Sequence, residues 1–294
     1  MNISKYRNSY LIDKAYRLTR VSVTLKALAP LMVFAAALIC GASVFTSCTV
    51  DNADNPATPK TKTVLMGMDF MGHPFYGDVT YSYIYDDDCR LVKMKEEQVG
   101  TDLVITDFDY TYTPGHITKQ GRQEGYSVTE ECSLDDHGRI VELVHTSLDY
   151  ETQKVYHFTY TYTYDKDGRL ATMSQLTEGE PIITTYIWEG GDLRSMSVSQ
   201  EQVQYLMVDE YETSNVPAQA FFNHIGYSEA EELCQQGCFG VLPLHLPSKL
   251  TNTIYLKDVQ LLKKTTEYSY TVTDGRVVAV SQGKTTYVLH WGQQ

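Results

Sequence analysis

The chain has 294 residues, 43% of them hydrophobic, and a formal net charge of −13 because 37 acidic residues outnumber 24 lysines and arginines. A surface with this charge repels phosphate, which argues against nucleic acid as a partner and against a basic patch on anionic lipid. The length is sufficient for one all-β barrel or sandwich with its own core.

The first 47 residues have the organisation of a secretory signal peptide. A basic leader precedes an apolar run at 27–44, and small residues then lead to Ser47 and Cys48. This ending is typical of a lipobox, in which the thiol of Cys48 is acylated and the cysteine becomes the first mature residue. Cys40 is a poorer candidate because the bulky Ile39 precedes it. The alternative is a transmembrane anchor, since about 18 apolar residues could marginally span a bilayer.

Residues 48–62 are predicted to be the lipidated cysteine and a flexible tether. The segment contains two prolines and several Asn and Asp residues, with almost no large apolar side chain. It cannot bury enough surface to order itself. We therefore predict one folded domain over 63–294, which carries most of the 18 basic and 36 acidic residues that remain after the leader is removed.

A repeated phrase dominates this domain: alternating tyrosines, an Asp-rich turn, and then Arg followed by an aliphatic residue. Clear copies lie at 81–91 and 160–170, and looser or degenerate copies at 110–117, 135–140, 186–193 and 268–277. Repetition on this scale indicates one supersecondary unit used many times.

Each copy is predicted to be a β-hairpin. Alternating tyrosines, as in 158–164, place their rings on one face of a strand. The Asp and Gly residues that follow suit a tight reversal, and Gly168 and Gly275 are expected to have positive φ. The fold class is therefore all-β, an antiparallel meander of repeated hairpins that forms a curved or closed, barrel-like sheet. Its tyrosine rows either pack across strands or stack on sugar rings.

The region 205–255 interrupts the repeat, with a short helical insert near 216–247. Ser228 and Glu231 form a capping box and Gly237 is a suitable stop, so a helix is expected from about residue 229 to 236.

An apolar, proline-containing run follows at 238–247. This run either fills the concave side of the sheet as a plug or forms a groove for a ligand or partner. The candidate residues for either role are Phe239, Val241, Leu242 and Leu244.

The sequence predicts no metal site and no cofactor. The Asp-rich segment at 165–168 resembles the start of a calcium loop, but Arg169 occupies a position that needs an oxygen ligand, and a hairpin turn explains the same residues. Cys234 and Cys238, with His224 and His245 nearby, suggest zinc only weakly.

Disulfides are permitted outside the cytoplasm, and four cysteines allow three connectivities among which the sequence does not choose. These cysteines are Cys89, Cys132, Cys234 and Cys238.

The repeats resemble the tyrosine-aspartate repeats of Rhs shell proteins. The layout of residues 45–291 is still more similar to a family of Bacteroidota lipoproteins of unknown function, from the lipobox ending in Cys48 through the segment 246–250 to the final strand ending in Trp291. This resemblance implies an antiparallel, porin-like sheet with an associated insert, and no activity. The sequence departs from the repeat at Cys89, which replaces the turn glycine, and it has far fewer repeats than an Rhs-type toxin cocoon needs.

We therefore expect a lipid-anchored protein of the cell envelope, attached to the outer membrane through Cys48, that acts as a binding or structural module for a glycan or protein partner. No catalytic motif of the nucleophile-elbow, metalloprotease or phosphate-loop type occurs, so an enzyme is not expected. Two alternatives remain: a glycan- or cell-wall-active enzyme with unidentified carboxylates, and an integral outer-membrane barrel.

Overall fold

The computed structural model describes residues 63–293 except 74–75, 177–179, 202–203 and 219–229. The predicted signal peptide, Cys48 and the tether lie outside the described residues, so these assignments stay predictions. Within the described ranges no helix is long and apolar enough to cross a membrane.

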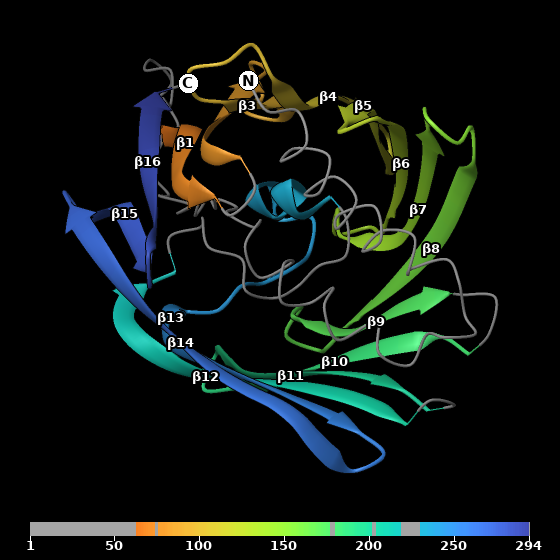
Figure 1. The fold of residues 1–294 in the computed structure, drawn as a ribbon, viewed down its shortest axis with the longest axis vertical. Coiled ribbons are helices and arrows are strands. Elements are labelled where there is room, and N and C mark those ends of the chain that lie inside the picture. Colours follow the sequence, from red (N-terminus) through yellow and green to blue (C-terminus); the bar gives the residue numbers. More distant parts are fainter. Residues whose placement is uncertain (1–62, 74–75, 177–179, 202–203, 219–229, 294) are drawn as a thin grey trace, which may run out of the picture. The chain divides into compact units, whose positions relative to one another are not determined.

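The sixteen strands of the described residues close into one antiparallel barrel, in which each strand pairs with its neighbours in sequence and β1 pairs with β16 (Figure 1). The all-β hairpin prediction is confirmed, and the sheet is closed. The strands are β1 Thr63–His73, β2 Gly77–Tyr85, β3 Leu91–Gln98, β4 Val104–Thr113, β5 His116–Gln123, β6 Tyr126–Leu134, β7 Ile140–Asp149, β8 Val155–Tyr164, β9 Leu170–Leu176, β10 Ile182–Glu189, β11 Asp192–Gln200, β12 Tyr205–Pro217, β13 His245–Leu256, β14 Val259–Thr273, β15 Arg276–Gln282 and β16 Thr285–Gln293.

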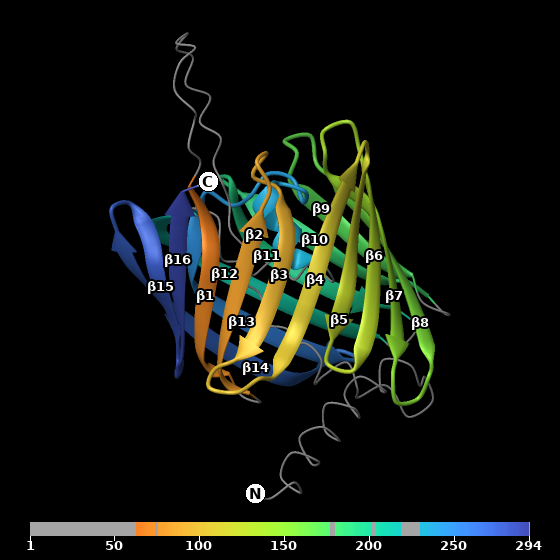
Figure 2. The same ribbon diagram turned by 90° about the horizontal axis from the view of Figure 1, so that it is seen from above.

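All six predicted hairpins are present, as β2–β3, β4–β5, β6–β7, β8–β9, β10–β11 and β14–β15. Because successive strands are antiparallel, their turns share one rim, which we call the Asp-turn rim and which is uppermost in Figure 2. Two further even–odd strand pairs complete the barrel. The insert replaces the turn between β12 and β13, and the ends of the barrel domain replace the turn between β16 and β1.

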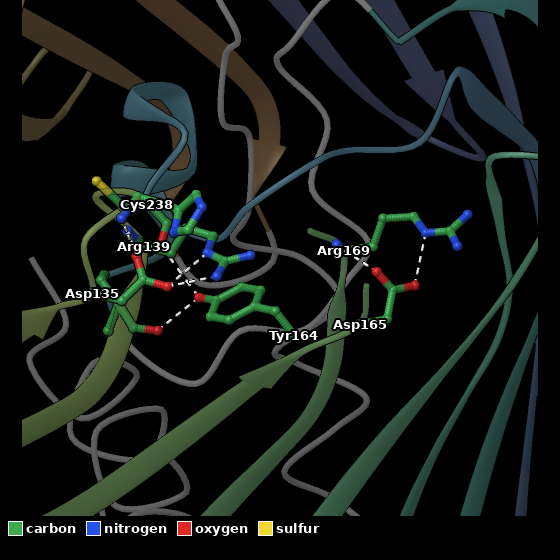
Figure 3. A network of polar contacts seen from close by, with 8 residues as sticks. Asp135, Arg139, Tyr164, Asp165, Arg169 and Cys238 are labelled. Atoms are coloured by element: carbon green, nitrogen blue, oxygen red, sulfur yellow. Dashed lines mark hydrogen bonds and ion pairs between the residues drawn. The ribbon is translucent and has the colours of Figure 1, made fainter. Parts of the chain in front are cut away.

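The first aspartate of each clear Asp turn holds the reversal together. The Oδ1 atom of Asp165 accepts the backbone N–H groups of Asp167 and Arg169, each at 2.9 Å, and its Oδ2 atom accepts the Arg169 Nε–H at 2.9 Å (Figure 3). The same three bonds recur from Asp86 and from Asp135. The carboxylate thereby satisfies turn amides that the sheet leaves without partners.

The turn backbone is left-handed where the sequence predicts it. Gly168 and Gly275 have φ values of 79° and 73°, which confirms the prediction. Cys89, at the position of the glycine in the first clear repeat, keeps the same conformation at a φ of 59°.

The aromatic residue near the end of an even strand bonds to the preceding odd strand. Tyr164 of β8 donates its hydroxyl to the carbonyl oxygen of Ile140 on β7 at 2.6 Å. Equivalent bonds join Tyr85 to Leu65, Tyr112 to Leu91, Trp188 to Leu170, Tyr270 to Pro247 and Trp291 to Val277. The repeated Tyr or Trp therefore fastens one hairpin to the one before it.

Side chains alternate between the interior and the outside of the barrel. On β8, Tyr160 and Tyr162 are only 1% and 3% exposed, and the ring of Tyr162 packs edge-on against Phe239 of the insert at 5.3 Å. The intervening Thr161 and Thr163 are exposed. The tyrosine rows therefore face inward and form much of the core.

We expect Gly275→Val to lower the free energy of unfolding by about 1 kcal/mol or more, because valine is strained at this positive φ. No atom lies within 4 Å of a Cβ built on Gly275, so the effect isolates backbone strain. Gly168→Val should cost at least as much, since its Cβ would already contact Val241 at 3.4 Å. Cys89→Gly is the control and should not destabilise the protein. Urea unfolding measures all three, and an unchanged midpoint for Gly275→Val would count against the turn assignment.

Candidate functional site inside the barrel

The insert forms a short 3-10 helix, η1, over Glu231–Gln236. The predicted capping box does not start this helix. Ala230 is the N-cap, has a φ of 53° and makes no side-chain cap hydrogen bond, while Ser228 lies outside the described residues. The predicted stop is confirmed, because Gly237 is the C-cap with a φ of 74° and its N–H bonds to the carbonyl of Cys234. The helix lies inside the ring of strands (Figure 1).

After η1 the chain crosses the Asp-turn rim and is bonded to three successive hairpins. The N–H of Ile140 donates to the Cys238 carbonyl at 2.7 Å, the N–H of Val241 to Gly168 at 2.9 Å, and the N–H of Leu244 to Gly191 at 3.2 Å. Tyr164 also donates to the Cys238 carbonyl, at 3.4 Å (Figure 3). These backbone bonds hold the insert across the rim.

Two details fix this crossing. A Cβ on Gly240 would clash with the carbonyl oxygen of Gly168, so the close approach requires glycine. At the end of the crossing, Asp192 accepts the backbone N–H of His245 at 2.8 Å and contacts its ring Nδ1 at 2.9 Å. His245 thus has a structural partner, and His224, the other histidine of the zinc hypothesis, lies outside the described residues.

The structure divides the four candidate residues of the insert. Phe239 is fully buried, Leu242 is partly buried, and Val241 and Leu244 are 52% and 56% exposed on the rim. The apolar surface that faces the interior instead comes from residues on either side of Gly237. These are Ala230, Leu233, Cys234, Cys238 and Phe239.

A buried polar network joins η1 to the inner wall. Glu232 accepts a hydrogen bond from the hydroxyl of Tyr110 at 2.8 Å and forms an ion pair with the ammonium group of Lys119 at 3.0 Å. Lys119 also pairs with Glu130 at 3.2 Å, and Glu130 contacts Nδ1 of His145 at 3.1 Å. The ammonium of Lys119 lies 4.2 Å from the ring centre of Phe108.

The register of the barrel creates this network. Tyr110 pairs with Lys119, Lys119 with Glu130 and Glu130 with His145, so four inward side chains on β4 to β7 form one row. Sequence reasoning missed these residues. The available signal was that Lys119 and Glu130 occupy strand positions whose neighbours two residues away are apolar, as Ile117 and Val128 are.

The cysteines are free thiols in the described part of the chain. Cys132, Cys234 and Cys238 are buried, and burial raises the pKa of the Cys238 thiol to about 12. A thiol held in this neutral form is a poor nucleophile and a poor metal ligand. Within the described ranges no three His, Cys, Asp or Glu side chains are grouped to hold a metal ion.

Crystal structures of two porin-like proteins have a similar fold. The porin-like protein from Bacteroides uniformis ATCC 8492 matches with a TM-score of 0.55 and 15% identity, over 81% of this chain and 99% of its own. The porin-like protein from Bacteroides vulgatus ATCC 8482 matches with a TM-score of 0.56 and 11% identity, over 77% of this chain and 97% of its own. No family model and no curated protein matches the chain. The fold is therefore a porin-like barrel.

Phe239→Ala should lower the free energy of unfolding by about 3–5 kcal/mol, because it leaves a cavity beside Tyr162. Val241→Ala, two residues away on the exposed rim, should change it by less than about 0.5 kcal/mol. Thermal melting followed by circular dichroism measures both. Unaltered stability of Phe239→Ala would mean that the segment does not pack as a plug.

Lys119→Met should cost about 3–5 kcal/mol, because it leaves Glu130 and Glu232 buried without their cation. The matched control is Lys95→Met on the outward face of β3, where the pair with Glu97 is solvent-exposed and a change within about 0.5 kcal/mol is expected. Equal losses in the two variants would contradict the buried network.

Proposed function

We propose that this protein is a lipid-anchored, extracytoplasmic barrel of the cell envelope that acts as a binding or structural module. The observation that carries the proposal is a closed barrel whose tyrosine-lined interior is crossed at one rim by its own insert. An insert bonded to three hairpins and packed through Phe239 favours a filled interior over an aqueous pore.

The outward face supports a barrel in water rather than in lipid. Lys93 of β3 pairs across strands with Asp107 and Asp109 of β4 at 2.9 and 3.0 Å. Lys249 of β13 pairs with Glu212 of β12, and His290 of β16 pairs with Asp69 of β1. Charged pairs around the outside would be costly on a lipid-facing surface, which needs an apolar band. The integral outer-membrane barrel is therefore the second candidate.

The N-terminal features supply the attachment and the location. The apolar run at 27–44 followed by Ser47 and Cys48 favours export and lipidation. A lipid-modified terminus anchors a water-facing domain stably when it carries a second acyl chain or is helped by a second membrane-binding signal. The likeness of the Tyr-Asp repeats to those of Bacteroidota lipoproteins supports the same location. We place the anchor in the outer membrane.

A binding role accords with the chemistry of the interior better than an enzymatic one. The buried carboxylates Glu130 and Glu232 are both bonded to Lys119, and Glu96 accepts hydrogen bonds from Tyr81 and Thr106. These acids have structural partners in place of the facing, separated arrangement that glycoside hydrolysis requires. A glycan or a protein segment is the partner class we propose for the envelope role.

Cys48→Ala should move the protein from the membrane fraction to the soluble fraction of the envelope, because the lipid is the proposed attachment. Cys40→Ala is the matched control and should leave the protein in the membrane fraction. Fractionation with a carbonate wash, and mass measurement of the N-terminal peptide, provide the readout. A Cys48→Ala protein that still sediments with membranes after the wash would favour the integral barrel.

A further inference from the structure

A second buried polar cluster lies on the inner wall formed by β10 to β14, outside the network that holds η1. Its centre is Asp209 of β12, which is 2% exposed and accepts a hydrogen bond from Nδ2 of Asn252 at 2.6 Å. The register aligns Tyr186, Met196, Asp209 and Asn252 across β10 to β13. These four side chains therefore share the inward face.

Tyrosines surround this carboxylate. Tyr205 and Tyr211 lie four residues before and two residues after Asp209 on the same face of β12, and both are buried. Tyr268 of β14 is also buried. Burial is the main cause that raises the pKa of all three phenols; the charge of Asp209 is the next cause for Tyr205 and Tyr211, and for Tyr268 it follows the contribution of Tyr287. Asp209 thus shares the inner wall with tyrosines from β12 and β14.

Asp209 differs from Glu130 and Glu232 in its partners and resembles the buried Glu96, which is also held by hydrogen bonds alone. Glu130 and Glu232 share Lys119, whereas in the described part of the chain no Lys, Arg or His forms an ion pair with Asp209. Among the residues that the structure describes, the hydroxyl of Tyr205, a side chain only 4% exposed, has no hydrogen-bond partner, and neither has the buried hydroxyl of Thr184 on β10. A buried carboxylate without a cation and unsatisfied hydroxyls are costly features that call for a ligand.

We propose that this cluster is a binding site for an alkylammonium cation, with Asp209 as the counter-charge and the surrounding tyrosines as the aromatic wall. Tyrosine faces attract organic cations through the ring quadrupole, and the attraction grows when both groups are desolvated. The Asn252 side-chain oxygen and the Tyr205 hydroxyl are acceptors for any polar group that the cation carries.

The cluster lies nearer to the rim opposite to the insert. β12 begins at the rim opposite to the insert, so Tyr205 and Asp209 lie in the half of the strand nearer that rim. The proposed ligand class specifies the binding role proposed above, and its biological meaning rests on that role. Binding of the cation itself can be tested without a membrane.

The test titrates choline into the mature full-length protein and follows heat of binding and melting temperature. The control probe is 3,3-dimethylbutan-1-ol, which has the shape of choline without its charge. Choline should bind saturably and raise the melting temperature, and the neutral alcohol should bind about tenfold or more weakly. Equal responses to the two probes, or no response to choline, would overturn the proposal.

Asp209→Asn should abolish the preference for choline, whereas Asp109→Asn, on the exposed outward face, should retain it. Asp209→Asn is expected to fold and to melt at a higher temperature at pH 7, because it removes a buried charge at constant shape. Retained choline binding in this variant would assign binding to another place and overturn the proposal.

A pH series on the unmodified protein gives an independent measurement. Burial raises the pKa of Asp209 to about 6, and the ionised form is the one that binds a cation. Choline affinity should therefore be full above this value and fall as the pH is lowered through about 6. Affinity that is flat between pH 5 and pH 7.5 would exclude Asp209 as the counter-charge. If choline does not bind although the protein is anchored through Cys48, the proposed ligand class is refuted and the proposed envelope role is not.

Discussion

Closure of the sheet, by pairing β1 with β16, is the constraint on which the rest of the structure depends. A closed sheet has no free edges, and it divides every strand into residues that face the interior and residues that face outward. Most of the inward side chains are buried, so their polar atoms need partners within the protein. The tyrosines do so at the Asp-turn rim, where their hydroxyls bond to backbone carbonyls of the preceding strand, as Tyr164 does with Ile140. The rings are the core, and the hydroxyls join the hairpins.

The same constraint explains where the insert lies. Eight pairs of neighbouring strands meet at this rim. Six are joined by short turns, one (β16 and β1) contains the two ends of the domain, and one (β12 and β13) is joined by the long insert. An apolar connection at a barrel mouth can hide its side chains only by turning inward. Phe239 packs on Tyr162, and Glu232 reaches Lys119, because the wall offers both an aromatic surface and a buried cation.

The interior therefore has two chemically different walls. On β3 to β7 the buried acids are paired or hydrogen-bonded, and Glu232 of the insert takes part in this network. On β10 to β14, Asp209 has an amide partner, and the hydroxyls of Tyr205 and Thr184 have no hydrogen-bond partner among the described residues. The proposed envelope role and the proposed cation site are consistent with each other, since the outward face carries charged pairs suited to water.

The sequence by itself determined the hairpins, because alternating tyrosines and Asp-Gly turns encode local geometry that each repeat expresses alone. Gly168, Gly275 and the stop at Gly237 follow from the same local rule. The start of the helix did not, because the capping-box pattern of Ser228 and Glu231 is only a local preference, and η1 begins at Glu231 with Ala230 as its N-cap. Only the tertiary structure decided that the sheet closes, that Lys119 meets both Glu130 and Glu232, and that Asp209 shares its wall with tyrosines and has no cation partner among the described residues. Register brings together residues far apart in sequence, and no local pattern records which inward side chains will face one another across a closed barrel.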